Sequence, residues 1–230
     1  MKDRRTRKIL QALTLIAFSA PAWVGQTKVD TPSQEIERHV AGVSLSQVTI
    51  VNAATGALNP ARVPAGIATS STCGSENFLN LSPAGPRLRD LFDSIEVADP
   101  RYHLTLDQEV MNLTPVQSEP TLLDVVIPSF DVEGEPTVDW IVEQLLNTSA
   151  LQKAAVELKL QRGYAEIGLR SLERPGYPKP AGKVFDVHLR NVTLRAALNR
   201  VARAHGTAVW HYDQKQCKNA HEFTLKFLVW

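Results

Sequence analysis

The 230-residue chain lacks several features that would point to a particular chemistry. Its two cysteines, Cys73 and Cys217, form no Cys-x-x-Cys pair, and there is no glycine-rich phosphate loop, no His-Glu-x-x-His and no Gly-x-Ser-x-Gly motif. The 25 basic residues are balanced by 24 acidic ones, so the cationic excess that nucleic-acid binding requires is missing. We therefore predict that the protein is not an enzyme, binds no nucleic acid, and has no cofactor or metal site.

The apolar stretch near the N-terminus is too short to span a bilayer comfortably, since a span needs about 20 residues. The uncharged run from Ile9 to Ala22 follows five basic residues among the first eight positions and ends in Ala20-Pro21-Ala22. Small residues at the third and first positions before the cut are typical of signal-peptide cleavage. The sequence thus predicts that residues 1–22 are a secretory signal peptide and that the protein is periplasmic or secreted. An uncleaved membrane anchor is the alternative.

Without this leader, 208 residues remain, with 20 basic and 23 acidic side chains, which is an ordinary, mildly acidic balance. Residues 23–39 are polar and have no convincing period, so we predict a flexible lead-in there. Breaks in the apolar pattern divide the rest into a first α+β unit at 40–116, a connector at 117–121 and a second α+β unit at 122–230.

Two segments share the order strand, helix, strand, strand at an offset of 106 residues. Both helices carry one apolar stripe with the spacing i, i+3, i+4 and i+7. The stripes are Leu88, Leu91, Phe92 and Ile95 in the first, and Leu194, Ala197, Leu198 and Val201 in the second. We predict an α+β fold of two repeated strand-helix-strand-strand units with helices packed on short sheets. The units either share a core or form linked domains.

The same patterns predict which side chains are buried. The expected core includes Leu88, Leu91, Phe92, Ile95, Leu104, Ile141, Leu145, Leu194, Leu198, Val201 and Trp210. His211 lies between Trp210 and Tyr212 in an alternating strand and is expected to face solvent. Ser44, placed before Leu45 like an N-cap, suggests a helix over 43–54.

The segment 185–212 combines an alternating strand, the helix start Val192-Thr193-Leu194-Arg195, a helix end at Gly206 and a second alternating strand. This pattern resembles the short N-terminal domain shared by secretins and TonB-dependent receptors. Residues 78–113 resemble it less closely, because they lack the Val-Thr-Leu entry and the glycine. The resemblance implies a periplasmic module that pairs with partner proteins or with its own copies in rings. No plug, barrel or secretin core follows the segment here, so we expect a free-standing exported protein.

Two groups of residues have the composition of a chemical site without its spacing. Possible metal ligands crowd the C-terminus at His205, His211, Cys217 and His221. Cys217-x-x-x-His221 could supply two zinc ligands, but no Cys-x-x-Cys or His-x-x-x-His pair is present, so we predict no metal site. Cys73, His103 and Asp99 have the residue types of a nucleophilic triad, but no nucleophile-elbow motif positions them.

The two cysteines are candidates for a disulfide. Cys73 and Cys217 fall in polar segments of different units, and the predicted compartment is oxidising. An intramolecular bridge would tie the first unit to the last, whereas free thiols and intermolecular pairing remain open alternatives.

The leading functional prediction is a non-enzymatic protein-interaction module of the cell envelope, in contact with the membrane only if the leader is uncleaved. Short sheets expose edges, to which an extended segment of a protein partner can add a strand. Segment 125–132 is the candidate edge, because Pro128 cannot donate a ladder hydrogen bond. The alternative is a small extracytoplasmic hydrolase or ligand-binding protein with a cleft between the two halves. A deep cleft lined by converging His, Asp or Arg side chains would favour that alternative.

Overall fold

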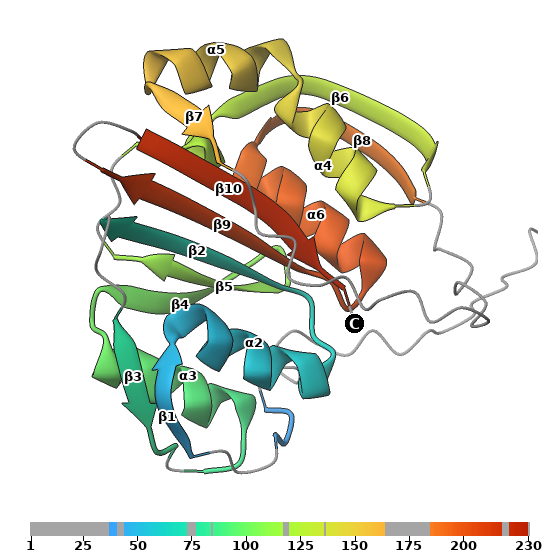
Figure 1. Ribbon diagram of the computed structural model, residues 1–230. Helices are drawn as coiled ribbons and strands as arrows, with labels where there is room; N and C mark the ends of the chain where they lie inside the picture. Colours follow the sequence, from blue (N-terminus) through green and yellow to red (C-terminus); the bar gives the residue numbers. More distant parts are fainter. Residues whose placement is uncertain are drawn as a thin grey trace, which may run out of the picture. The chain divides into compact units, whose positions relative to one another are not determined.

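A computed structural model describes residues 37–40, 44–72, 77–83, 85–116, 120–135, 137–163, 185–217 and 221–229 (Figure 1). All of them belong to a compact unit at 31–230. The predicted leader at 1–22 and most of the lead-in at 23–39 lie outside the described residues. Within these ranges, five α-helices and ten strands form an α+β fold. No helix in the described ranges is long and apolar enough to cross a membrane.

One mixed sheet of six strands runs through both predicted units, in the order β4-β5-β2-β9-β10-β7. Its strands are β2 (Ala65–Thr72), β4 (Tyr102–Asp107), β5 (Val110–Pro115), β7 (Leu160–Arg162), β9 (Val209–Gln216) and β10 (His221–Leu228). Strands β2 and β9 are parallel and pair along their full length, from Ala65 opposite Val209 to Thr72 opposite Gln216. The two predicted units therefore share a sheet instead of meeting only through a linker.

Two short antiparallel ladders accompany the central sheet. Strand β1 (Leu45–Thr49) pairs with β3 (Phe78–Leu81), and β6 (Val126–Glu135) pairs with β8 (Phe185–Thr193). The first ladder has a register shift between Leu45 and Val48, where Gln47 has a positive φ of 54°. The second ladder is about twice as long and has its register shift near its end, between Val132 and Glu135.

Capping residues mark the ends of several helices. The helices are α2 (Ile50–Ala61), α3 (Leu88–Ala98), the 3-10 turn η1 (Leu122–Asp124), α4 (Val138–Leu146), α5 (Ser149–Glu157) and α6 (Leu194–His205). The hydroxyls of Thr49, Thr137 and Thr193 accept backbone N–H bonds at three of the N-termini, which satisfies otherwise unpaired donors. Gly206 ends α6 with a φ of 92°, a conformation that favours glycine.

The first half (40–116) and the second half (122–230) carry their elements in the same order, apart from η1 and α5 in the second. Each has a two-stranded ladder (β1 with β3, β6 with β8) and a three-stranded part of the central sheet (β4-β5-β2 and β9-β10-β7). Within each part, the first pair of strands is antiparallel and the second pair is parallel. The pairing of β2 with β9 joins the two parts edge to edge.

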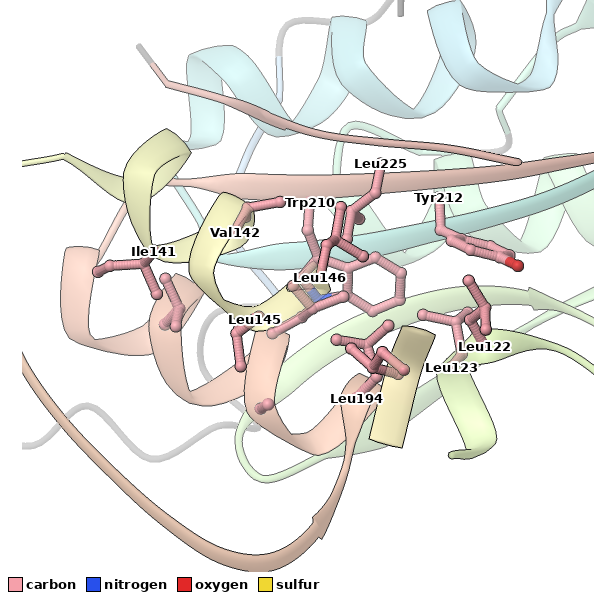
Figure 2. Close-up of a cluster of buried hydrophobic side chains, with 14 of the residues drawn as sticks. Leu122, Leu123, Ile141, Val142, Leu145, Leu146, Leu194, Trp210, Tyr212 and Leu225 are labelled. Atoms are coloured by element: carbon pink, nitrogen blue, oxygen red, sulfur yellow. The ribbon is translucent and has the colours of Figure 1, made fainter. Parts of the chain in front are cut away.

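Two hydrophobic clusters lie on opposite faces of the central sheet. Val209 belongs to the cluster formed with α2 and α3, whereas its neighbour Trp210 belongs to the cluster formed with α4, η1 and α6. Successive residues of a strand point to opposite faces, so the helices of each half cover a different face. Figure 2 shows the second cluster, where Trp210, Tyr212 and Leu225 of the sheet meet side chains of α4, α6 and η1.

Most of the predicted core is buried, and three local expectations need correction. Leu104 is only half-buried, because β4 is an edge strand. The segment predicted as a helix over 43–54 is instead strand β1 followed by α2, whose N-cap is Thr49. The end of the predicted flexible lead-in is held in place, since Arg38 Nη1 donates to the Ala61 carbonyl (2.8 Å) and its own carbonyl accepts from Leu88 N–H (2.9 Å).

Candidate functional site

The pairing of β2 with β9 joins the two halves, and we call it the seam. At the seam, Trp210 lies in tight contact with Gly66. A Cβ atom at Gly66 would lie 2.1 Å from Trp210 Cζ2 and 2.5 Å from Asn112 Oδ1, so only glycine leaves room for the indole ring. The indole Nε1–H donates to Asn199 Oδ1 (2.8 Å), and Asn199 Nδ2 donates to Asp107 Oδ2 (3.1 Å). A buried polar chain therefore runs from β9 through α6 to the hairpin of the first half.

A small pocket opens at the same seam, near the carboxyl ends of β5, β2 and β9. Its lining comes from both halves: Ala68, Thr69, Ser70, Thr114, Pro115, Thr121, Leu123, Arg195, Tyr212 and Gln214. Arg195, its one basic side chain, lies 3.3 Å from Asp124 Oδ1. The pocket volume of about 20 Å³ has room for roughly one water molecule. This is not the deep cleft that a hydrolase or small-molecule binder would need.

His211 is buried in the seam with 8% of its surface exposed, so the prediction that it faces solvent was wrong. β9 is an interior strand with β2 on one side and β10 on the other, and both of its faces are covered at this point. His211 Nε2 lies 3.2 Å from Thr69 Oγ1, whereas its Nδ1 has no hydrogen-bond partner among the described residues. Burial, helped by the charges of Lys226 and Lys215, lowers the pKa of His211 to about 4. The imidazole is therefore neutral near pH 7.

Among the described residues, the sequence-predicted metal ligands do not converge on one site. No group of three metal-ligating side chains occurs within the residues that the structure describes. His221 is exposed at the start of β10, and His205 Nδ1 lies 3.2 Å from the hydroxyl of Thr207. Asp99 is engaged by Arg101, whose Nη2 donates to Oδ2 at 2.6 Å and holds the pKa of the carboxyl below its ordinary value.

Cys217 directly follows β9, and Cys73 lies outside the described residues. Thr72 and Gln216, the residues before them in the chain, face each other in the parallel pairing of β2 with β9. Neighbouring strands are about 4.8 Å apart, which is within the Cα separation that a disulfide spans. This register supports the predicted bridge between Cys73 and Cys217, which stays a prediction.

The outer edges of the central sheet offer little to a partner strand. On β4, Tyr102 N–H donates to the Asp99 carbonyl (3.1 Å), and Leu104 N–H donates to the Glu96 carboxylate (2.5 Å). Both amides are thus occupied by groups from α3 and the turn after it. At the opposite edge, β7 is only three residues long. Natural sheets limit edge-to-edge association by such short and covered edges.

The β6–β8 ladder is different, because β6 is ten residues long and, among the residues that the structure describes, has a strand on one side only. The sequence-predicted edge at 125–132 coincides with β6 from Val126 onward, and this strand is not in the middle of a sheet. Leu194 N–H donates to the Val125 carbonyl (3.0 Å), which extends the ladder beyond the start of β6. We therefore take the outer edge of β6 as the candidate interaction site.

Charged side chains line the exposed face of this ladder. Asp131 on β6 accepts a hydrogen bond from Arg190 Nη1 (2.8 Å) and lies 3.1 Å from His188 Nδ1, both on β8. The hydrogen bonds from Arg190 and His188 hold the pKa of Asp131 below its ordinary value. Asp131 therefore stays ionised at neutral pH. Sequence reasoning located the edge through Pro128, but it missed these charges, because the pairing of Asp131 with His188 depends on the register.

No family model, no characterised protein and no solved structure matches the chain in the three comparisons.

Proposed function

We propose that this chain is an exported, non-enzymatic protein-interaction module of the cell envelope, and that it binds its partner along the outer edge of β6. The observation that carries the proposal is that β6, which is ten residues long, has a strand on one side only within the described part of the chain. A partner segment placed along this edge would gain main-chain hydrogen bonds, as in strand addition.

Three further observations support this proposal over a small-molecule function. The pocket at the seam holds roughly one water molecule, which is too small for a metabolite. Elements in the same order in both halves support a duplicated unit, as the 106-residue offset predicts. The likeness of 185–212 to the short N-terminal domain of secretins and TonB-dependent receptors favours the periplasm, where that family pairs with proteins. The predicted signal peptide at 1–22 agrees with that location.

Position-dependent crosslinking tests the proposed function. A photoreactive amino acid at Ser129, exposed on β6, should capture an extended segment of a protein from the periplasmic or secreted fraction. The matched control carries the same group at Asp93, which is exposed on α3 in the other half. Crosslinks of equal yield from both positions, or from neither, would contradict binding at β6.

N-terminal sequencing should show that the exported protein begins at residue 23, and an intact leader would indicate a membrane anchor.

A further inference from the structure

The exposed part of β6 alternates between acidic and apolar character. Ser129, Asp131 and Glu133 face solvent, whereas Phe130 and Val132 between them are 8% and 9% exposed. These two values are among the highest in the hydrophobic core, so Phe130 and Val132 lie at its margin. The strand therefore presents carboxylates on one face and the rim of the core on the other.

A strand added beside β6 would place its own side chains next to the acidic residues on one face and next to the apolar residues on the other. Directly opposite side chains in neighbouring strands interact, and opposite charges stabilise the pair whereas like charges destabilise it. Residues beside Asp131 and Glu133 would therefore be favoured as lysine or arginine. Residues beside Phe130 and Val132 would extend the core, and apolar side chains suit that position.

The charges also weigh against a second copy of this chain as the occupant. Two β6 strands paired with each other would bring Asp131 and Glu133 of one copy near the same acids of the other. Asp131 already engages Arg190 and His188 of its own ladder. Glu133 is thus the carboxylate that we expect to pair with an incoming base.

We propose that the outer edge of β6 binds an extended segment of an exported protein in which basic residues alternate with apolar ones. This inference rests on the proposed function and names the chemistry of the partner. It requires a basic side chain beside Glu133 on the exposed face of the new strand, with apolar side chains flanking it on the other face. Both the alternation and the charge sign are needed, since a block of lysines would match only the acids.

Three capped synthetic peptides of eight residues test the proposal with the full-length chain. The first alternates valine and lysine, the second alternates valine and glutamate, and the third has the composition of the first with four lysines followed by four valines. Fluorescence anisotropy should give about tenfold tighter binding for the first peptide than for either control. Hydrogen exchange should show new amide protection in β6 and little change in β4.

Single substitutions at exposed positions locate the effect. Glu133→Gln should weaken binding of the valine–lysine peptide by about threefold, and Glu133→Lys should shift the preference toward the valine–glutamate peptide. Asp93→Asn removes one exposed carboxylate from α3 and should leave both affinities unchanged. Circular dichroism of each variant checks that the fold is retained, and Glu133→Lys remains informative because it predicts a gain of binding.

The outcomes separate this inference from the proposed function. Equal binding of the first two peptides at β6 would overturn the inferred preference for basic residues and leave strand addition intact. Binding of the lysine-block peptide as tight as that of the alternating one would show attraction to the acids alone and would overturn the inference. If no peptide protects β6 and crosslinking from Ser129 also captures nothing, the proposed function fails as well.

Discussion

The two halves of the chain share their order of elements and differ in where they leave strand edges open. In the first half, the ladder of β1 with β3 is four to five residues long and is interrupted by a register shift. In the second half, the ladder of β6 with β8 extends over nine to ten residues. The third strand of the first half, β2, is an interior strand of eight residues, whereas its counterpart β7 is an edge strand of three.

This difference indicates that the two halves have different structural roles. The first half contributes its long strand β2 to the seam, and groups from α3 cover its outer strand β4. The second half keeps its outer strand β7 short, and its long strands β6 and β8 each pair with one strand only among the described residues. The proposed partner strand would therefore add to the second half, while the first half supports the sheet.

The largest effect expected is from the predicted bridge between the halves. If Cys73 and Cys217 are joined, the bridge closes most of the chain into one loop, and removing it should lower the free energy of unfolding by about 4–5 kcal/mol in the chain-entropy treatment. Urea unfolding of the oxidised protein and of a Cys73→Ser/Cys217→Ser variant measures the difference. Non-reducing peptide mass mapping is the control. Two alkylatable thiols in never-reduced protein would show that Cys73 and Cys217 are not joined.

Matched core truncations test whether the halves are equally important to the fold. Leu88 begins α3 and Leu194 begins α6, and both side chains are 0% exposed. Leu88→Ala and Leu194→Ala should each destabilise the protein by about 2–5 kcal/mol, because each leaves a cavity in a packed cluster. Denaturant melts followed by fluorescence and by circular dichroism should coincide. A change under about 0.5 kcal/mol for either variant would contradict the equivalence of the two positions.

The smallest effect expected concerns His211, which makes the second half sensitive to acid. Its pKa is about 4 in the fold, against about 6.5 in an unfolded chain, so the unfolded state binds more protons between these values. The stabilisation is complete above pH 6.5 and falls by roughly 3 kcal/mol as the pH drops through this window to 4. His211→Gln should flatten the profile of unfolding free energy against pH over that range. His221→Gln, at an exposed position, is the control, and identical profiles for both variants would refute the assignment.

Local sequence patterns predicted the helices of this fold better than its sheet. The stripe from Leu194 to Val201 and the caps at Thr193 and Gly206 are all found where the spacing places them. Such signals depend on residues three or four positions apart, which the sequence displays directly. The α+β class follows from these elements.

The pairing of distant strands could not be predicted in the same way. His103 and His211 each alternate with apolar residues, and the sequence treats them alike. His211 is buried because β9 lies inside the sheet, whereas His103 on the edge strand β4 is half-buried. Likewise, the acidic face of β6 is visible in the sequence, but its neighbours Arg190 and His188 depend on a register that spans more than fifty residues. Edge or interior position is a property of the whole sheet, so it is absent from any local window.

The parallel joint between β2 and β9 also sets an order of events during synthesis. β2 ends at Thr72, whereas β9 begins at Val209, so a growing chain completes the first long before the second exists. Until β9 arrives, one side of β2 is an open row of amides and carbonyls on an otherwise complete first half. Such an edge invites pairing between molecules. Premature folding of the first half would therefore favour association between molecules, until β9 of the second half pairs with the open edge of β2.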